Sequence, residues 1–147
     1  SVFEMVRKSG FPGMKVLEFA FSADGQSIYL PYHYDENCVV YTGTHDNDTI
    51  QGWYEAMPEW DFSIRYLGNR HTPRKEIHWD FIRAALGSRA RLAVIPMQDY
   101  LGLGSEARIN EPSTLGDNWK WRLLPDEFDG KLAEACRDLA WVYGRLG

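Results

Sequence analysis

Three short apolar runs, bounded by turn residues or polar clusters, predict buried strands at positions 15–21, 38–42 and 91–97. Each run is almost continuously apolar, so we expect these strands to be covered on both faces, as in a parallel α/β layout. Glu18 interrupts the first run. A carboxylate in an apolar strand must be paired or must face a polar lumen.

Helical spacing of apolar residues predicts three helices among these strands. The first begins at Asp48 or Thr49, either of which can cap it, and ends at Pro58. The second begins with Thr72 as its N-cap and ends near Gly87. The third spans about 130–143. Polar clusters directly follow the second and third strands, at the carboxyl ends where parallel α/β folds bind ligands.

Composition and length exclude several classes of protein. The 147 residues carry 16 Lys and Arg against 21 Asp and Glu, a formal net charge of −5, which disfavours nucleic acid as a partner. No run of 18 apolar residues predicts a membrane span, and residues 1–8 lack the apolar region of a signal peptide. Cys38 and Cys136 fit two buried thiols in a reducing compartment. We interpret 1–147 as one segment, too short for a complete (β/α)₈ barrel of about 250 residues.

Aromatic residues make up 14% of the chain, with six Trp, eight Tyr and seven Phe. Large aromatic side chains fill protein cores, and composition alone favours that interpretation. Sugar binding is the alternative, because the apolar faces of pyranose rings stack on flat aromatic rings.

The densest polar cluster is 44–49, directly after the second strand. Four interpretations compete for it. His45 could form an acid/base pair with Asp46 or Asp48, or all three could hold the metal of a metal-dependent hydrolase. Asp48 and Thr49 could serve only as a helix cap. The cluster could also bind a sugar, with a carboxylate accepting hydrogen bonds from vicinal hydroxyls.

A second constellation lies between positions 102 and 122. It mixes flat rings with hydrogen-bonding groups in the order Asn118, Trp119, Trp121, Arg122. A loop pinned by buried tryptophans explains these residues slightly better than a sugar site does. For Asn110, in the same stretch, a sugar contact is plausible.

Four blocks of this sequence, in order, resemble 4-α-glucanotransferases, the amylomaltases or disproportionating enzymes of glycoside hydrolase family 77. The blocks are GMKVLEFAF at 13–21, YTGTHDNDT at 41–49 followed by Gly52 and Trp53, QDYLGLG at 98–104, and NWKWR at 118–122. The C-terminal Tyr-Gly-Arg at 143–145 also resembles the family's usual end. Several ordered blocks are far more specific than a single short motif.

The resemblance implies an α/β fold: the C-terminal portion of a (β/α)₈ TIM barrel, strands six to eight with their helices, incomplete as an isolated chain. It implies a retaining double displacement on α-1,4-glucan, with a carboxylate nucleophile and a glutamic acid about 5–5.5 Å apart. A third carboxylate, which stabilises the transition state, corresponds to Asp46. Its sugar-binding neighbours correspond to His45 and Asn110. The resemblance implies no cofactor and no metal, and a cytoplasmic location, or a plastid in a plant.

No block for the nucleophile or the acid/base glutamate matches this chain, so we expect the isolated chain to be inactive. Two loop residues also depart from the family pattern: Ser113 stands where Gly is expected, and His33 where Asn is expected. The alternative function is a non-catalytic glucan-binding or assembly module. Three barrel strands without their neighbours leave two open sheet edges, so we also expect self-association.

Overall fold

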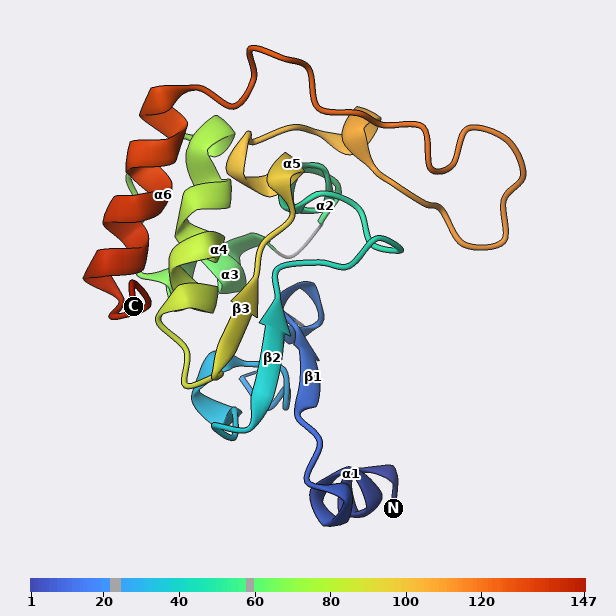
Figure 1. Ribbon diagram of the computed structural model, residues 1–147, viewed down its shortest axis with the longest axis vertical. Coiled ribbons are helices and arrows are strands. Elements are labelled where there is room, and N and C mark those ends of the chain that lie inside the picture. Colours follow the sequence, from blue (N-terminus) through green and yellow to red (C-terminus); the bar gives the residue numbers. More distant parts are fainter. Residues whose placement is uncertain (22–24, 58–59) are drawn as a thin grey trace.

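A three-stranded parallel sheet forms the centre of the computed structural model, which describes residues 1–21, 25–57 and 60–147 (Figure 1). Its strands are β1 (Gly13–Val16), β2 (Cys38–Tyr41) and β3 (Leu92–Val94), in the order β1-β2-β3. Val16 pairs with Tyr41, and Tyr41 with Val94, so the three carboxyl ends are level. The predicted parallel α/β layout is therefore confirmed.

The first and third strands are shorter than the sequence predicts. β1 ends at Val16, and the rest of the apolar run forms the 3₁₀ helix η1 (Leu17–Ala20). Leu17 and Ala20 are fully buried in η1, while Glu18 N–H still donates to Thr42 O over 3.1 Å. An apolar run indicates that the residues are buried, but it does not indicate whether they form a strand or a buried 3₁₀ helix. β3 ends before Pro96, which has no N–H to donate to a neighbouring strand.

Helices precede, separate and follow the strands. They are α1 (Val2–Ser9), α2 (Ile50–Ala56), α3 (Trp60–Leu67), α4 (Ile77–Leu86), α5 (Met97–Tyr100) and α6 (Gly130–Val142), with 3₁₀ turns η2 (Pro31–His33), η3 (Arg74–Glu76) and η4 (Ser105–Ala107). The predicted helices at 48–57 and 130–143 are confirmed as α2 and α6, although Pro58 itself lies outside the described residues. The sequence analysis missed α1 and α3.

Side-chain caps explain where these helices begin. The Thr49 hydroxyl accepts a hydrogen bond from Gly52 N–H at the start of α2, and Asp129 accepts one from Leu132 N–H at the start of α6. The prediction for Thr72 is wrong. Its hydroxyl donates to Asp80 Oδ2 over 2.6 Å, η3 follows Pro73, and α4 begins only at Ile77. Gly87 is the C-cap of α4, as predicted.

The hydrophobic core lies between the sheet and the helices. Val40 of β2 belongs to it together with Ile50, Ile77 and Phe81. The Phe81 ring makes edge contacts with Phe21 at 5.2 Å and with Trp53 at 5.5 Å, measured between ring centroids. Much of the aromatic content is therefore structural, and it fixes α2 and α4 against the end of the sheet where the polar loops begin.

The opposite face of the sheet is uncovered. Met14, Leu92 and Val94 share this face through the strand register, and their side chains are 62%, 53% and 38% exposed. The expectation that both faces are covered is therefore wrong for this chain, because its core forms on one side only. Among the described residues, β1 and β3 also have no further strand beside them. In the same residues, no helix has the length and apolarity to cross a membrane.

Candidate functional site

The loop after β2 is held in one conformation by its own polar side chains. Asn47 Oδ1 accepts hydrogen bonds from both the N–H (2.9 Å) and the hydroxyl (2.7 Å) of Thr44. Thr49 ends the loop by capping α2. The two residues between these fixed points, His45 and Asp46, are exposed at the carboxyl end of the sheet.

Asp46 is the centre of a small hydrogen-bonded group. Its Oδ1 accepts a hydrogen bond of 2.7 Å from the Asn110 side-chain amide, and His45 Nε2 lies 3.3 Å from the same oxygen. Within the described ranges, no protein group donates to its Oδ2. One carboxylate oxygen is therefore fixed by the protein, and the other is left for an external donor such as a sugar hydroxyl.

Backbone contacts hold the segment of Asn110 against the loop of Asp46. Asn110 N–H donates to His45 O over 3.0 Å. The Arg108 guanidinium bridges the two segments, donating to Asp46 O over 2.8 Å and to Asn110 O over 2.9 Å. The fold thus brings together the three predicted site residues His45, Asp46 and Asn110, although Asn110 lies 64 positions after Asp46 in the chain.

A pocket of about 520 Å³ opens beside this group, at the carboxyl ends of β2 and β3. Trp121 lines it, while the Trp119 ring lies 5.1 Å from the His45 ring and tilted by 36°. Trp119 is exposed, so the interpretation of a loop pinned by buried tryptophans is wrong for this residue. In Figure 1 this segment, between η4 and α6, runs across the end of the molecule where β2 and β3 terminate.

Two buried carboxyl groups belong to this region: Asp99 lines the pocket, and Glu18 lies against Gly43 of its lining. The side chain of Glu18 is only 6% exposed, and its Oε1 is buried without a hydrogen-bond partner. Burial, together with the nearby charges of Asp99 and Asp48, raises the pKa of Glu18 to about 9, although Arg108 opposes the shift. Gly43 is required above it, since a Cβ there would lie 2.6 Å from Glu18 Oε1.

Asp99 is the second buried carboxyl group, and sequence reasoning missed its role. Its Oδ2 accepts a hydrogen bond from the Thr42 hydroxyl (2.5 Å), and its Oδ1 accepts one from Ile50 N–H (2.8 Å). The pKa of Asp99 is raised to about 6, because the effect of burial exceeds the opposing effect of these two hydrogen bonds. Asp99 therefore ties α5 to the end of β2 and the start of α2. A carboxylate directly after the third apolar run was the available signal.

Asp48 does not join His45 and Asp46. Its Oδ2 accepts a 2.6 Å hydrogen bond from Ser105, and its Oδ1 accepts one from Thr49 N–H. A Cβ on Gly52 would lie 2.3 Å from Ser105 Oγ, so this contact is tightly packed. Over residues 1–21, 25–57 and 60–147, no three His, Cys, Asp or Glu side chains are grouped to hold a metal ion.

A family model described as 4-alpha-glucanotransferase, glycoside hydrolase family 77, matches residues 1–126. The chain belongs to this family. It is 44% identical over 145 residues to the 4-alpha-glucanotransferase of Clostridium butyricum, covering 97% of this chain and 29% of that protein. It is 49% identical over 140 residues to the chloroplastic/amyloplastic 4-alpha-glucanotransferase of Solanum tuberosum, covering 92% of this chain and 24% of that protein.

The fold agrees with that of a solved member of the 4-alpha-glucanotransferase family. Amylomaltase from Streptococcus agalactiae in complex with acarbose superposes with a TM-score of 0.91 at 31% identity. The match covers 99% of this chain and 30% of that enzyme. The chain therefore spans under a third of the length of these relatives.

The departure at Ser113 has a visible consequence in the backbone of this family member. Ser113 has a φ of +66°, in the left-handed region that favours glycine, which is the residue expected there from the family resemblance. The loop keeps its conformation without the glycine, because Thr114 N–H and its hydroxyl both bond to Glu111 O.

Proposed function

We propose that residues 1–147 are part of the catalytic barrel of a longer 4-α-glucanotransferase, comprising barrel strands six to eight. That enzyme transfers α-1,4-glucan segments to a glucose or glucan acceptor with retention of configuration. The observation that carries this proposal is the arrangement at Asp46. One of its carboxylate oxygens is anchored by Asn110, and Asp46 lines a pocket at the carboxyl end of the sheet.

In this proposal Asp46 stabilises the transition state. Its free oxygen accepts hydrogen bonds from vicinal hydroxyls of the donor sugar, and these bonds strengthen as the ring distorts toward an oxocarbenium-like geometry. His45 binds an adjacent hydroxyl of the same sugar. Asn110 holds the Asp46 carboxylate in place and contributes to the donor site. The nucleophile and the acid/base glutamate belong to the rest of the longer enzyme.

The test is Asp46→Asn in the full-length enzyme, assayed by maltotriose disproportionation. The amide keeps the size of the side chain but loses the charge, so we expect kcat to fall by at least about 100-fold, as for removal of one oriented transition-state contact. Asp117→Asn is the matched control, because Asp117 is an exposed carboxylate whose one ion pair among the described residues is with Lys120. Near-normal transfer by Asp46→Asn would refute the assigned role.

The isolated 147-residue chain gives a second test. Without a nucleophile and a proton donor it should release no glucose and disproportionate no maltotriose. The exposed Trp119 beside His45 nevertheless favours residual sugar contact, which is the alternative function of a glucan-binding module. Titration of the chain with maltoheptaose, followed by tryptophan fluorescence, separates weak binding from a chain with no sugar site.

A further inference from the structure

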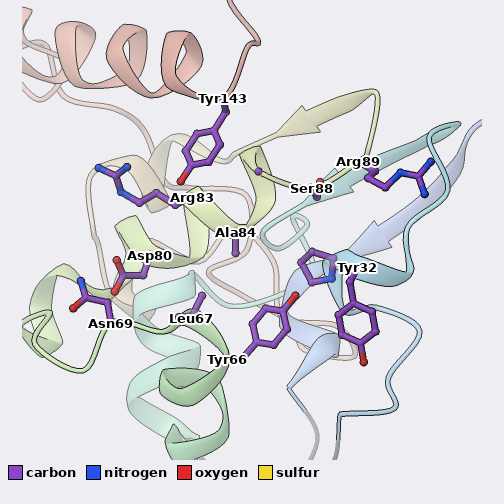
Figure 2. Close-up of a pocket in the computed structure, with 12 residues that line it drawn as sticks. Tyr32, Tyr66, Leu67, Asn69, Asp80, Arg83, Ala84, Ser88, Arg89 and Tyr143 are labelled. Atoms are coloured by element: carbon purple, nitrogen blue, oxygen red, sulfur yellow. The ribbon is translucent and has the colours of Figure 1, made fainter.

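A larger pocket, of about 860 Å³, lies along the outer face of α4, away from the Asp46 pocket (Figure 2). Four positions with helical spacing line it, namely Asp80, Arg83 and Ala84 of α4 and its C-cap Gly87. The remaining walls come from α3, from the η2 turn, from the residues just before β3, and from Tyr143 after α6. The two pockets have no lining residue in common.

Two tyrosine rings form a platform in this pocket. The ring centroids of Tyr32 and Tyr66 lie 6.5 Å apart with an angle of 33° between the rings, and Figure 2 shows the rings side by side. Tyr32 is 58% exposed although its hydroxyl donates to Gly25 O. Tyr66 is backed by Phe21, whose ring centroid lies 5.6 Å from that of Tyr66. Both rings are thus fixed before any ligand arrives, which lowers the entropic cost of binding.

Polar groups line the same pocket as the two rings. Arg83 and Arg89 line the pocket, and in the described part of the chain neither guanidinium group forms an ion pair or a hydrogen bond. Asp80 and Asn69 supply acceptor oxygens on the same wall. Mixed donors and acceptors around apolar rings suit a neutral ligand with many hydroxyls. Because Asp80 lines the same pocket, its carboxylate disfavours an anionic ligand such as a phosphate.

We propose that this pocket is a second binding surface for α-1,4-glucan, separate from the site at Asp46. Successive glucose units stack their apolar faces on Tyr32 and Tyr66, and their hydroxyls pair with Arg83 and Asp80. This inference rests on the proposed function, since it takes the same class of ligand. The surface holds a polysaccharide to the enzyme while a different chain end, or a small oligosaccharide, occupies the catalytic pocket.

The test is affinity electrophoresis of the full-length enzyme in gels containing amylopectin, combined with maltotriose kinetics. Tyr32→Ala should raise the dissociation constant for amylopectin at least fivefold and leave kcat/KM for maltotriose within twofold of wild type. Tyr32→Trp keeps a stacking face and should restore retention. Trp141→Ala, which removes an exposed ring outside the pocket, should change neither quantity.

Two results would contradict this proposal. Wild-type retention by Tyr32→Ala would overturn the second surface, and so would a parallel loss of retention and maltotriose transfer. Asp46→Asn should do the reverse of Tyr32→Ala, losing transfer while keeping retention. Normal transfer by Asp46→Asn would refute the proposed function without reference to Tyr32, so the two failures are distinguishable.

Discussion

The side-chain amide of Asn110 donates a 2.7 Å hydrogen bond to Asp46 Oδ1 across 64 positions of the sequence. Hydrogen bonds to a charged group contribute about 1.5–3 kcal/mol, and this one holds the Asp46 carboxylate to the segment of Asn110. In the full-length enzyme, Asn110→Ala should therefore lower kcat for maltotriose disproportionation by roughly 10- to 100-fold. Asn118→Ala should have little effect, because within the described residues the Asn118 side chain bonds to Glu111 and Thr114 and not to Asp46.

Asn110→Asp separates positioning from general loss of structure. It places a second carboxylate beside Asp46, so that the two share a proton more readily and the apparent pKa of the pair rises. At alkaline pH both carboxylates are ionised and neither can donate, so activity should be lowest there. It should partly recover at lower pH, where the pair holds one proton and a carboxyl O–H can replace the lost N–H donor. An unchanged profile together with reduced activity would contradict the positioning role.

Glu18 should make the stability of the chain fall with rising pH. Its pKa is about 9 in the folded protein, against about 4.5 for an ordinary glutamate, so the folded state binds more protons between these values. The stability that neutral Glu18 contributes is fully present below pH 4.5 and is lost as the pH rises toward 9. The free energy of unfolding should decrease by about 1.4 kcal/mol per pH unit.

Urea denaturation between pH 7 and 8.5 measures this slope. Asp99, whose pKa is about 6, has completed most of its own contribution below that window. Glu18→Gln keeps the shape of the side chain but cannot ionise, so its unfolding free energy should be nearly independent of pH there. Equal slopes for the wild-type chain and Glu18→Gln would show that Glu18 is not the group that titrates.

Much of this site was predictable because it depends on local order. His45 and Asp46 directly follow the short apolar strand β2. In a parallel sheet with level carboxyl ends, residues in this position lie at the carboxyl edge of the sheet. Asn110 came from family resemblance, and only the fold reveals that its amide reaches Asp46. Local pattern carries no information about a contact that closes over 64 residues.

The misses have physical causes of the same kind. The run that ends at Phe21 is apolar because it is buried, and burial does not distinguish η1 from a strand. Thr72 has the side chain of an N-cap, yet its hydroxyl donates to Asp80, which lies eight residues further along the chain within α4. The second pocket also escaped notice, because Tyr32, Tyr66 and Tyr143 come from three separate elements with no shared spacing.

We expect the isolated chain to self-associate through the uncovered side and the open edges of its sheet. β1 and β3 have unpaired edges in the described structure, and Leu92 and Val94 expose apolar surface on β3. Such edges pair with other chains unless a charge or a covering segment prevents it. Sedimentation velocity over a range of concentrations should therefore show reversible association.

Leu92→Lys, which places a charge at the exposed edge, should raise the dissociation constant at least tenfold. Leu115→Lys is the matched control, since Leu115 is fully exposed outside the strands. A wild-type chain that stays monomeric at every concentration would exclude association through the edges, and equal effects of the two lysines would assign it to net charge rather than to β3.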